Sequence, residues 1–208
     1  MSSGMSSEVT WGRPKPERAD AARNRQLLLD TARALLEEGG TGCLTMDLLA
    51  ERSGLGKGTV FRRFGSRAGI FQALLDDSER ELQQQVLSGP PPLGPGAPPA
   101  DRLVAYGTAR IRFLARHQAV ARATLDGRNT PAGRRPLSEI HLRVLLRELD
   151  PPGADVDVLA GQFAYALDGP LLLQVLGTPG PERRPPTDAD IARFEAGWRY
   201  LVERVCGA

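Results

Sequence analysis

The segment at residues 89–99, near the middle of the chain, constrains the fold most strongly. It reads GPPPLGPGAPP and contains six prolines. Proline lacks a backbone N–H and its ring clashes with the preceding helical turn, so a regular helix does not pass through such a segment. On both sides of it the apolar residues recur with helical spacing, and neither strand-like alternation nor an internal repeat is evident. The pattern predicts an all-α chain in two helical parts, with residues 88–100 as a linker or as an ordinary surface loop.

Helical periodicity, with the expected start and stop signals, predicts about nine helices. In the first of them Leu28, Ala32 and Leu35 share one face, and Gly39 and Gly40 end it. Thr187 and Asp190 have the spacing of a capping box at the start of the last one. The expected helices cover residues 22–38, 46–53, 57–64, 66–87, 101–116, 118–126, 137–149, 155–176 (bent or interrupted at Gly169-Pro170) and 187 onwards.

Composition narrows the class of protein. The chain has 208 residues, of which 41% are hydrophobic, so it can bury a substantial core in one large or two small domains. Two distant cysteines support neither a disulfide framework nor a zinc site. No apolar run approaches the roughly 18 residues of a membrane span, and the first 20 residues lack the apolar core of a secretion signal. We expect a cytoplasmic protein without membrane contacts, metal or cofactor.

Residues 46–65 have the spacing of a helix-turn-helix motif. Ala50 lies four residues before Gly54, Leu55 follows the glycine, and Val60 comes five residues later. A small residue lets two helices cross closely, glycine permits the tight turn, and the apolar residues hold the second helix on the first. In such motifs the second helix enters the major groove of DNA.

The charge distribution supports the same interpretation, although the formal net charge is only +2. The section between Arg52 and Arg67 contains five basic residues and no acidic one. A few phosphate contacts of this kind release counterions and give micromolar non-specific affinity for DNA, as an order of magnitude. The excess of arginine over lysine in the whole chain is attributed to a GC-rich genome and carries no functional information.

Residues 23–75 resemble the N-terminal domain of the TetR family of bacterial transcriptional regulators. The resemblance rests on Arg25, on Leu44-Thr45, on the run LAERSGLGKGTVFRRF at residues 49–64, on Ser66-Arg67 and on Ile70-Phe71. It implies a three-helix DNA-binding domain at residues 22–87, preceded by a flexible arm at 1–21. It also implies a helical effector-binding and dimerisation domain at 101–208. The basic arm either reaches a minor groove or is a disordered tail.

Carried over position by position, the resemblance implies a set of residues that contact double-stranded DNA. Gly56 replaces a frequent serine, so a backbone amide serves there instead of a hydroxyl. Phe61 replaces the usual tyrosine and is expected to pack rather than bind phosphate, whereas Arg67 is expected to reach a phosphate. Arg62 is expected either to hydrogen-bond a guanine edge or to bind a phosphate. The whole set is Thr45, Gly56, Lys57, Gly58, Thr59, Val60, Phe61, Arg62, Arg63 and Arg67.

The resemblance further implies a homodimer on a pseudo-palindromic operator, and a cavity for a small-molecule effector. Candidate polar residues for the cavity are Tyr106, Arg110, Arg122, Gln162, Tyr165 and Asp168; an arginine there suits an acidic ligand. Candidate dimer contacts are Leu171, Gln174, Ile191, Phe194, Trp198, Leu201 and Val205. The last five residues have a 3-4-3-4 spacing, which also fits a seam in the protomer's own core.

Three functions are compatible with this sequence. The first is a repressor that a small ligand releases from its operator. The second is a DNA-binding regulator without a small-molecule effector. The third is a helical enzyme or carrier with a vestigial helix-turn-helix. No catalytic constellation is found at residues 101–208: Ser138, Glu139 and His141 are close in sequence, but on a helix Glu139 and His141 point to different sides. We therefore do not expect an enzyme.

Overall fold

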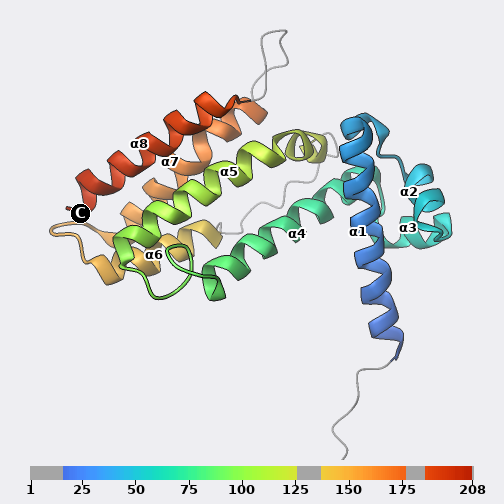
Figure 1. Ribbon diagram of the computed structural model, residues 1–208, viewed down its shortest axis with the longest axis horizontal. Helices are drawn as coiled ribbons and strands as arrows, with labels where there is room; N and C mark the ends of the chain where they lie inside the picture. The colour runs from blue at the N-terminus through green and yellow to red at the C-terminus, as the bar shows by residue number, and fades with distance from the viewer. Residues whose placement is uncertain (1–15, 126–136, 177–185, 208) are drawn as a thin grey trace, which may run out of the picture. The chain divides into compact units, whose positions relative to one another are not determined.

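The computed structural model describes residues 16–125, 137–176 and 186–207, with the side chains of 16–19, 122–125, 137 and 170–176 left aside. Side-chain predictions for Arg122, Leu171 and Gln174 therefore lie outside the described residues. Within the described ranges the fold is all-α (Figure 1). The helices are α1 (Pro16–Cys43), α2 (Met46–Ser53), α3 (Lys57–Phe64), α4 (Arg67–Ser88), α5 (Pro99–Leu125), α6 (Leu137–Leu149), α7 (Val156–Leu176) and α8 (Asp188–Cys206).

The structure corrects the predicted helix count in one place. The two helices expected at 101–116 and 118–126 are a single helix, α5, so the described residues form eight helices rather than nine. Its continuity has a local reason, because neither glycine nor proline follows Gly107 in α5. α7 likewise runs through Gly169-Pro170 without interruption.

The chain divides into two compact units, residues 1–67 and 68–208. This division falls after Arg67, the first residue of α4, whereas the sequence suggested a linker at residues 88–100. The reason is that Leu82 and Val86 of α4 join the hydrophobic core of the second unit. The proline-rich segment forms a loop of that same unit. Its Leu93 packs against the core, and the Gly94 N–H donates to the Pro90 carbonyl at 3.0 Å.

The first unit is built from α1, α2 and α3 (Figure 1). α1 buries Leu28, Leu29, Ala32 and Leu35 on one face, as its periodicity predicts. It starts at Pro16, within the segment predicted as a flexible arm, and proline is well suited to the first turn of a helix. Its regular part ends at Gly39 and Gly40, where the backbone leaves the helical region and Gly40 has a φ of 65°.

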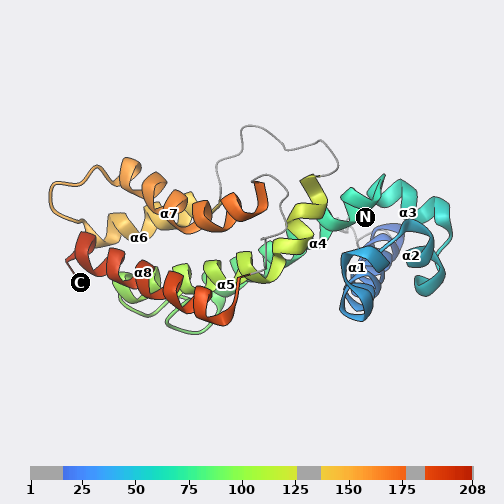
Figure 2. The same cartoon turned by 90° about the horizontal axis from the view of Figure 1, so that it is seen from above.

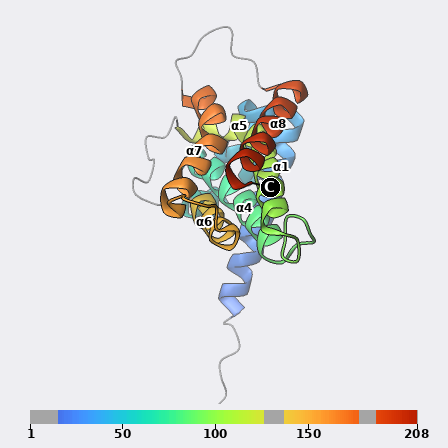
Figure 3. The ribbon, with the colours of Figure 1, turned by 90° about the vertical axis from the view of Figure 1, so that its left-hand side faces the viewer.

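The second unit is a helical bundle in two layers. α6 lies beside α7, and α5 lies beside α8, as the view from above makes clear (Figure 2). The end-on view shows α4, α5, α6, α7 and α8 grouped around a common interior (Figure 3). Leu103, Leu142 and Phe163 are among the buried residues that fill it.

The contact between α5 and α8 depends on Gly107. A Cβ atom at this position would lie only 1.9 Å from Nε1 of Trp198. The same Trp198 nitrogen donates a hydrogen bond of 3.0 Å to the Leu103 carbonyl, one turn earlier on α5. A larger residue at position 107 would push the indole ring out of its place.

Among the described residues, no helix is both long and apolar enough to cross a membrane.

Candidate functional site

The turn between α2 and α3 is built by local capping. The Thr45 side chain accepts a hydrogen bond from the Leu48 N–H at 3.1 Å and so caps α2. Gly54 ends α2 with a φ of 70°, a conformation that glycine adopts without steric cost. α3 has no side-chain cap at Gly56, and its first turn is closed by the backbone alone: the Gly56 carbonyl accepts a hydrogen bond from the Thr59 N–H at 2.8 Å. The two helices therefore form the helix-turn-helix predicted from the spacing of these residues.

The faces of α3 separate its residues into buried and exposed groups. Val60, for which either a contact with a thymine methyl or packing inward is compatible with the sequence, is completely buried and holds α3 against the rest of its unit. It therefore has the packing role. Phe61 was expected to pack, and this expectation is wrong because 65% of its side chain is exposed. Lys57, Gly58 and Arg62 share the exposed side with Phe61.

Two of the basic residues in this region form ion pairs with acidic residues outside the acid-free stretch. Arg52 pairs with Glu38 of α1 at 2.5 Å, and the Lys57 ammonium lies 2.8 Å from Asp47 of α2. Both pairs are exposed, and such pairs contribute only about 0–1 kcal/mol each. A DNA phosphate therefore competes for these cations at little cost.

Two further arginines bind backbone carbonyls. Arg63 donates from Nη2 to the Ala21 carbonyl of α1 at 2.5 Å. Arg67 donates from Nε to the Leu44 carbonyl at 2.7 Å and from Nη2 to the Thr41 carbonyl. Arg67 thus braces the segment before α2, although we had expected it to bind a phosphate. Of the basic residues between 52 and 67, only the Arg62 side chain makes no hydrogen bond or ion pair within the described residues.

The five candidate ligand residues whose side chains the structure describes do not come together. Tyr106, Arg110 and Asp168 are buried in the second unit, whereas Gln162 and Tyr165 are exposed, Tyr165 by 80%. Gln162 and Tyr165 are therefore wrong as lining residues of an internal cavity. They lie on α7 at positions that face away from its buried residues Phe163 and Leu167.

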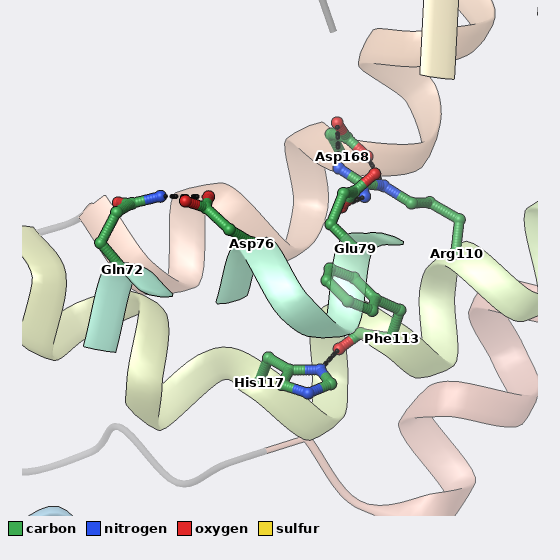
Figure 4. Close-up of polar contacts among 7 residues, drawn as sticks. All are labelled: Gln72, Asp76, Glu79, Arg110, Phe113, His117 and Asp168. Atoms are coloured by element: carbon green, nitrogen blue, oxygen red, sulfur yellow. Dashed lines mark hydrogen bonds and ion pairs between the residues drawn. The ribbon is translucent and has the colours of Figure 1, made fainter. Parts of the chain in front are cut away.

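Arg110 is held by two carboxylates of its own chain (Figure 4). Its Nε and Nη2 donate to the two oxygens of Asp168 at 2.9 and 3.1 Å, and its Nη1 donates to Glu79 at 2.7 Å. Burial alone would lower the pKa of Arg110, but the hydrogen bonds and charges of Asp168 and Glu79 raise it instead. Arg110 therefore stays charged and links α4, α5 and α7. Sequence reasoning missed Glu79, which lies 31 residues from its partner.

A cavity of about 320 Å³ lies between α4, α5 and α6, close to this ion-pair cluster. Its volume is at the lower end of the range of about 300–1,000 Å³ that small-molecule sites occupy. Of the five described residues that we predicted to line a cavity, Tyr106 alone lines this one. The walls are Glu79, Leu82, Gln83, Val86, Leu87, Pro95, Arg102, Tyr106, Ile140, His141 and Val144. Arg102 and His141 were not among the predicted lining residues.

The five candidate dimer residues on α8 also divide into buried and more exposed residues. Trp198 is only 4% exposed and packs edge to face on Phe163 at 5.1 Å between ring centroids, so it belongs to the protomer's own core and is wrong as a dimer contact. Ile191, Phe194 and Leu201 are half-buried, and Val205 is exposed. A hollow of about 340 Å³ on this side of the bundle is lined from α5, α7 and α8, among others by Phe194, Gly197 and Leu201.

Comparison with known proteins agrees with this geometry. Residues 28–74 match the family model described as bacterial regulatory proteins, tetR family. An HTH-type transcriptional regulator, SAR0097 of Staphylococcus aureus strain MRSA252, is 38% identical over 63 residues, which are 30% of this chain and 33% of the relative. The chain thus matches about a third of the length of that curated relative.

Solved structures match over nearly the whole chain. A TetR-family transcriptional regulator from Pectobacterium atrosepticum has a TM-score of 0.67 at 20% identity, covering 90% of this chain and 96% of the other. The structure titled SmeT-Triclosan complex has a TM-score of 0.50 at 17% identity, covering 88% and 90%. At these identities the likeness concerns the fold.

The fold and the α2–α3 site together define a helix-turn-helix protein with an N-terminal DNA-binding domain and a C-terminal helical bundle. Residues 28–74 match the model of the tetR family of bacterial regulatory proteins, and the solved structures share the fold of the chain as a whole.

Proposed function

We propose that this protein is a dimeric transcriptional repressor, acting in the bacterial cytoplasm, that leaves its operator when a small molecule binds. The observation that carries the proposal is the exposed face of α3. It presents Lys57, Gly58, Phe61 and Arg62 on a helix that Val60 anchors from the opposite side. A short helix with an exposed basic face, anchored by a buried residue on its other side, is suited to enter the major groove of DNA.

The side chains on this face support distinct contacts. Arg62 has five donors and no competing partner within the described residues, so it is available for a guanine edge or a phosphate. Phe61 has no polar group, and its exposed ring is suited to an apolar contact with a thymine methyl group. On binding DNA, the Lys57 ammonium leaves Asp47 and pairs with a phosphate. Thr45 keeps its predicted role at a phosphate, since its side chain is exposed beside the cap.

Dimerisation is proposed through α7 and α8. Their exposed surfaces carry large apolar or aromatic side chains, with Val158 exposed by 55%, Tyr165 by 80% and Tyr200 by 60%. Glycines on both helices, Gly161 and Gly197, allow a second copy to approach closely, and a Cβ at either would meet no atom within 4 Å. A two-fold dimer would place two α3 helices on half-sites about 34–36 Å apart or a multiple of this.

The cavity between α4, α5 and α6 supports control by a small molecule. α4 supplies part of its wall through Glu79, Leu82 and Val86, so a ligand there contacts the helix that directly follows the DNA-binding unit in sequence. A solved structure of similar fold, the SmeT-Triclosan complex, supports the proposal that a small molecule binds this fold. A near-complete switch requires a difference in affinity between two states of about 3–5 kcal/mol.

The decisive experiment is footprinting of the purified full-length protein on the DNA that flanks its own gene. We expect protection of a pseudo-palindromic site with half-sites about one helical turn apart. Arg62→Ala should weaken the protection, and Arg116→Ala, which removes an exposed charge from α5, serves as the matched control. Equal binding of all DNA sequences would contradict a specific regulator, and no binding at all would favour a helical enzyme or carrier.

A further inference from the structure

The polar end of the cavity between α4, α5 and α6 contains a cation without a counter-charge. The Nε atom of Arg102 is buried and has no hydrogen-bond partner, and within the described residues no carboxylate lies within ion-pairing distance of its guanidinium. Arg102 as a whole is half-buried, and a partly desolvated charge is stabilised when an anion pairs with it. Glu79, the acidic residue of the same wall, is already engaged by Arg110 at 2.7 Å and does not supply the missing charge.

A second unpartnered polar atom lines the same cavity. Nε2 of His141 is buried without a hydrogen-bond partner, while the imidazole packs edge to face on Tyr106 at 4.8 Å between ring centroids. Burial, and then the positive charge of Arg102, lowers the pKa of His141 to about 4. The imidazole is therefore neutral at physiological pH and has one N–H to donate, which a ligand acceptor can draw to Nε2.

The remainder of the cavity is apolar and opens toward solvent. α4 contributes Leu82, Val86 and Leu87, and α6 contributes Ile140 and Val144. Three of these five side chains are strongly exposed, namely Leu87 by 71%, Ile140 by 46% and Val144 by 48%. Exposed aliphatic side chains gathered around one opening are unusual on a protein surface and indicate a binding site for an apolar group.

We infer that this cavity binds an amphipathic carboxylate, whose carboxylate group accepts hydrogen bonds from Arg102 and His141 and whose hydrocarbon part lies between α4 and α6. The inference deepens the proposed function, on which it rests, by naming the chemical class of the effector. The charge balance favours an anion. Arg110 is compensated by Asp168 and Glu79, so Arg102 is the charge of this cavity wall that lacks compensation.

The test uses three probes with the same hydrocarbon tail on the full-length protein: decanoate, decan-1-ol and decyltrimethylammonium. Calorimetry should show that decanoate binds at least about tenfold more tightly than the alcohol, because a charge-assisted hydrogen bond is stronger than a neutral one. The cationic probe should bind more weakly still. Equal affinity for the acid and the alcohol, or no binding of decanoate, would overturn the inference.

Two variants locate the binding. Arg102→Gln should remove the preference for decanoate over decanol, while Arg116→Gln, an exposed position on the same helix, should keep it. Val144→Trp narrows the apolar opening at an exposed position and should weaken the binding of both decanoate and decanol. A variant that blocks the cavity is thereby distinguished from one that only removes the positive charge. Preserved discrimination in Arg102→Gln contradicts the assignment, provided that circular dichroism shows a folded protein.

DNA binding is measured in parallel so that two possible failures remain distinct. If decanoate binds in an Arg102-dependent manner but leaves the DNA affinity unchanged, the ligand class is correct and the release mechanism is wrong. If another compound releases the DNA while decanoate does not bind, the proposed function stands and the inferred ligand class is wrong.

Discussion

Arginine occupies two opposite environments in the two units of this protein. On α3, Arg62 is exposed and has no partner among the described residues, and the neighbouring Lys57 is joined to Asp47 only by an exposed ion pair. In the helical bundle, Arg110 is about 90% buried as a side chain and two carboxylates hold it. The first arrangement leaves cations available to an external anion, and the second commits the cation to the fold. Burial, rather than residue type, separates a binding charge from a structural one.

The strongest test of this contrast is the stability of charge-deletion variants. Arg110→Ala leaves two carboxylates without their cation in a buried site and should cost about 3–5 kcal/mol of unfolding free energy. Arg112→Ala removes an exposed arginine of the same helix that pairs with Glu195 at 2.6 Å, and should cost less than about 1 kcal/mol. Urea unfolding monitored by circular dichroism measures both. Equal losses would show that burial does not separate the two arginines.

A second test addresses the exposed arginines and uses DNA affinity. Arg62→Ala should cost about 1–3 kcal/mol of operator binding if the guanidinium reads a base. If Arg62 contacts a phosphate instead, the loss should be equal on all sequences, and the slope of log affinity against log salt should fall by about one. Fluorescence anisotropy at several salt concentrations separates these outcomes.

Arg63→Ala is the matched comparison for Arg62. Because Arg63 already donates to the Ala21 carbonyl, its removal should weaken DNA binding less than removal of Arg62. A larger effect at Arg63, with no effect at Arg62, would contradict the distinction between a free and a committed arginine on α3.

A third test uses pH on a buried ionisable group of the bundle. His141 has a folded-state pKa of about 4, below the value of about 6.5 that is usual for an unfolded chain. Between these values the unfolded state binds more protons, so stability is present above about pH 6.5 and is lost as the pH falls toward 4. His141→Gln should make stability less dependent on pH, by about 1 kcal/mol between pH 6.5 and 5 after allowance for partial exposure. Unfolding midpoints that keep the same pH dependence in wild type and variant would contradict this.

The sequence predicted those features of the fold that depend on residues close together in the chain. The capping box of Thr187 and Asp190 is present, and so is the turn at Gly54. Phe61 was misplaced because its role was inferred from the residue it replaces, although its position one residue after the anchoring Val60 sets it on a different side of the helix. A prediction from helical phase alone would have placed it on the exposed face.

Partners that are distant in the chain escaped prediction altogether. Arg110 with Glu79, Arg67 with the Leu44 carbonyl and Trp198 with the Leu103 carbonyl join residues 31, 23 and 95 positions apart. Nothing in the local pattern distinguishes an arginine that will meet a carbonyl from one that will meet solvent. The same limit applies to Arg102, whose importance lies in the lack of a neighbouring carboxylate among the described residues.

The smallest expected effect on DNA affinity concerns Asp47, the partner of Lys57 at the DNA-binding face. Asp47→Asn frees Lys57 from its ion pair and removes a negative charge from the neighbourhood of α3, so DNA affinity should rise by about 0.3–1 kcal/mol at low salt. The gain should shrink as salt screens exposed charges. Glu37→Gln, which removes an exposed carboxylate of α1, is the control and should leave the affinity nearly unchanged. A similar gain in DNA affinity in both variants would mean that only the net charge matters. The ion pair between Asp47 and Lys57 would then have no specific effect on DNA binding.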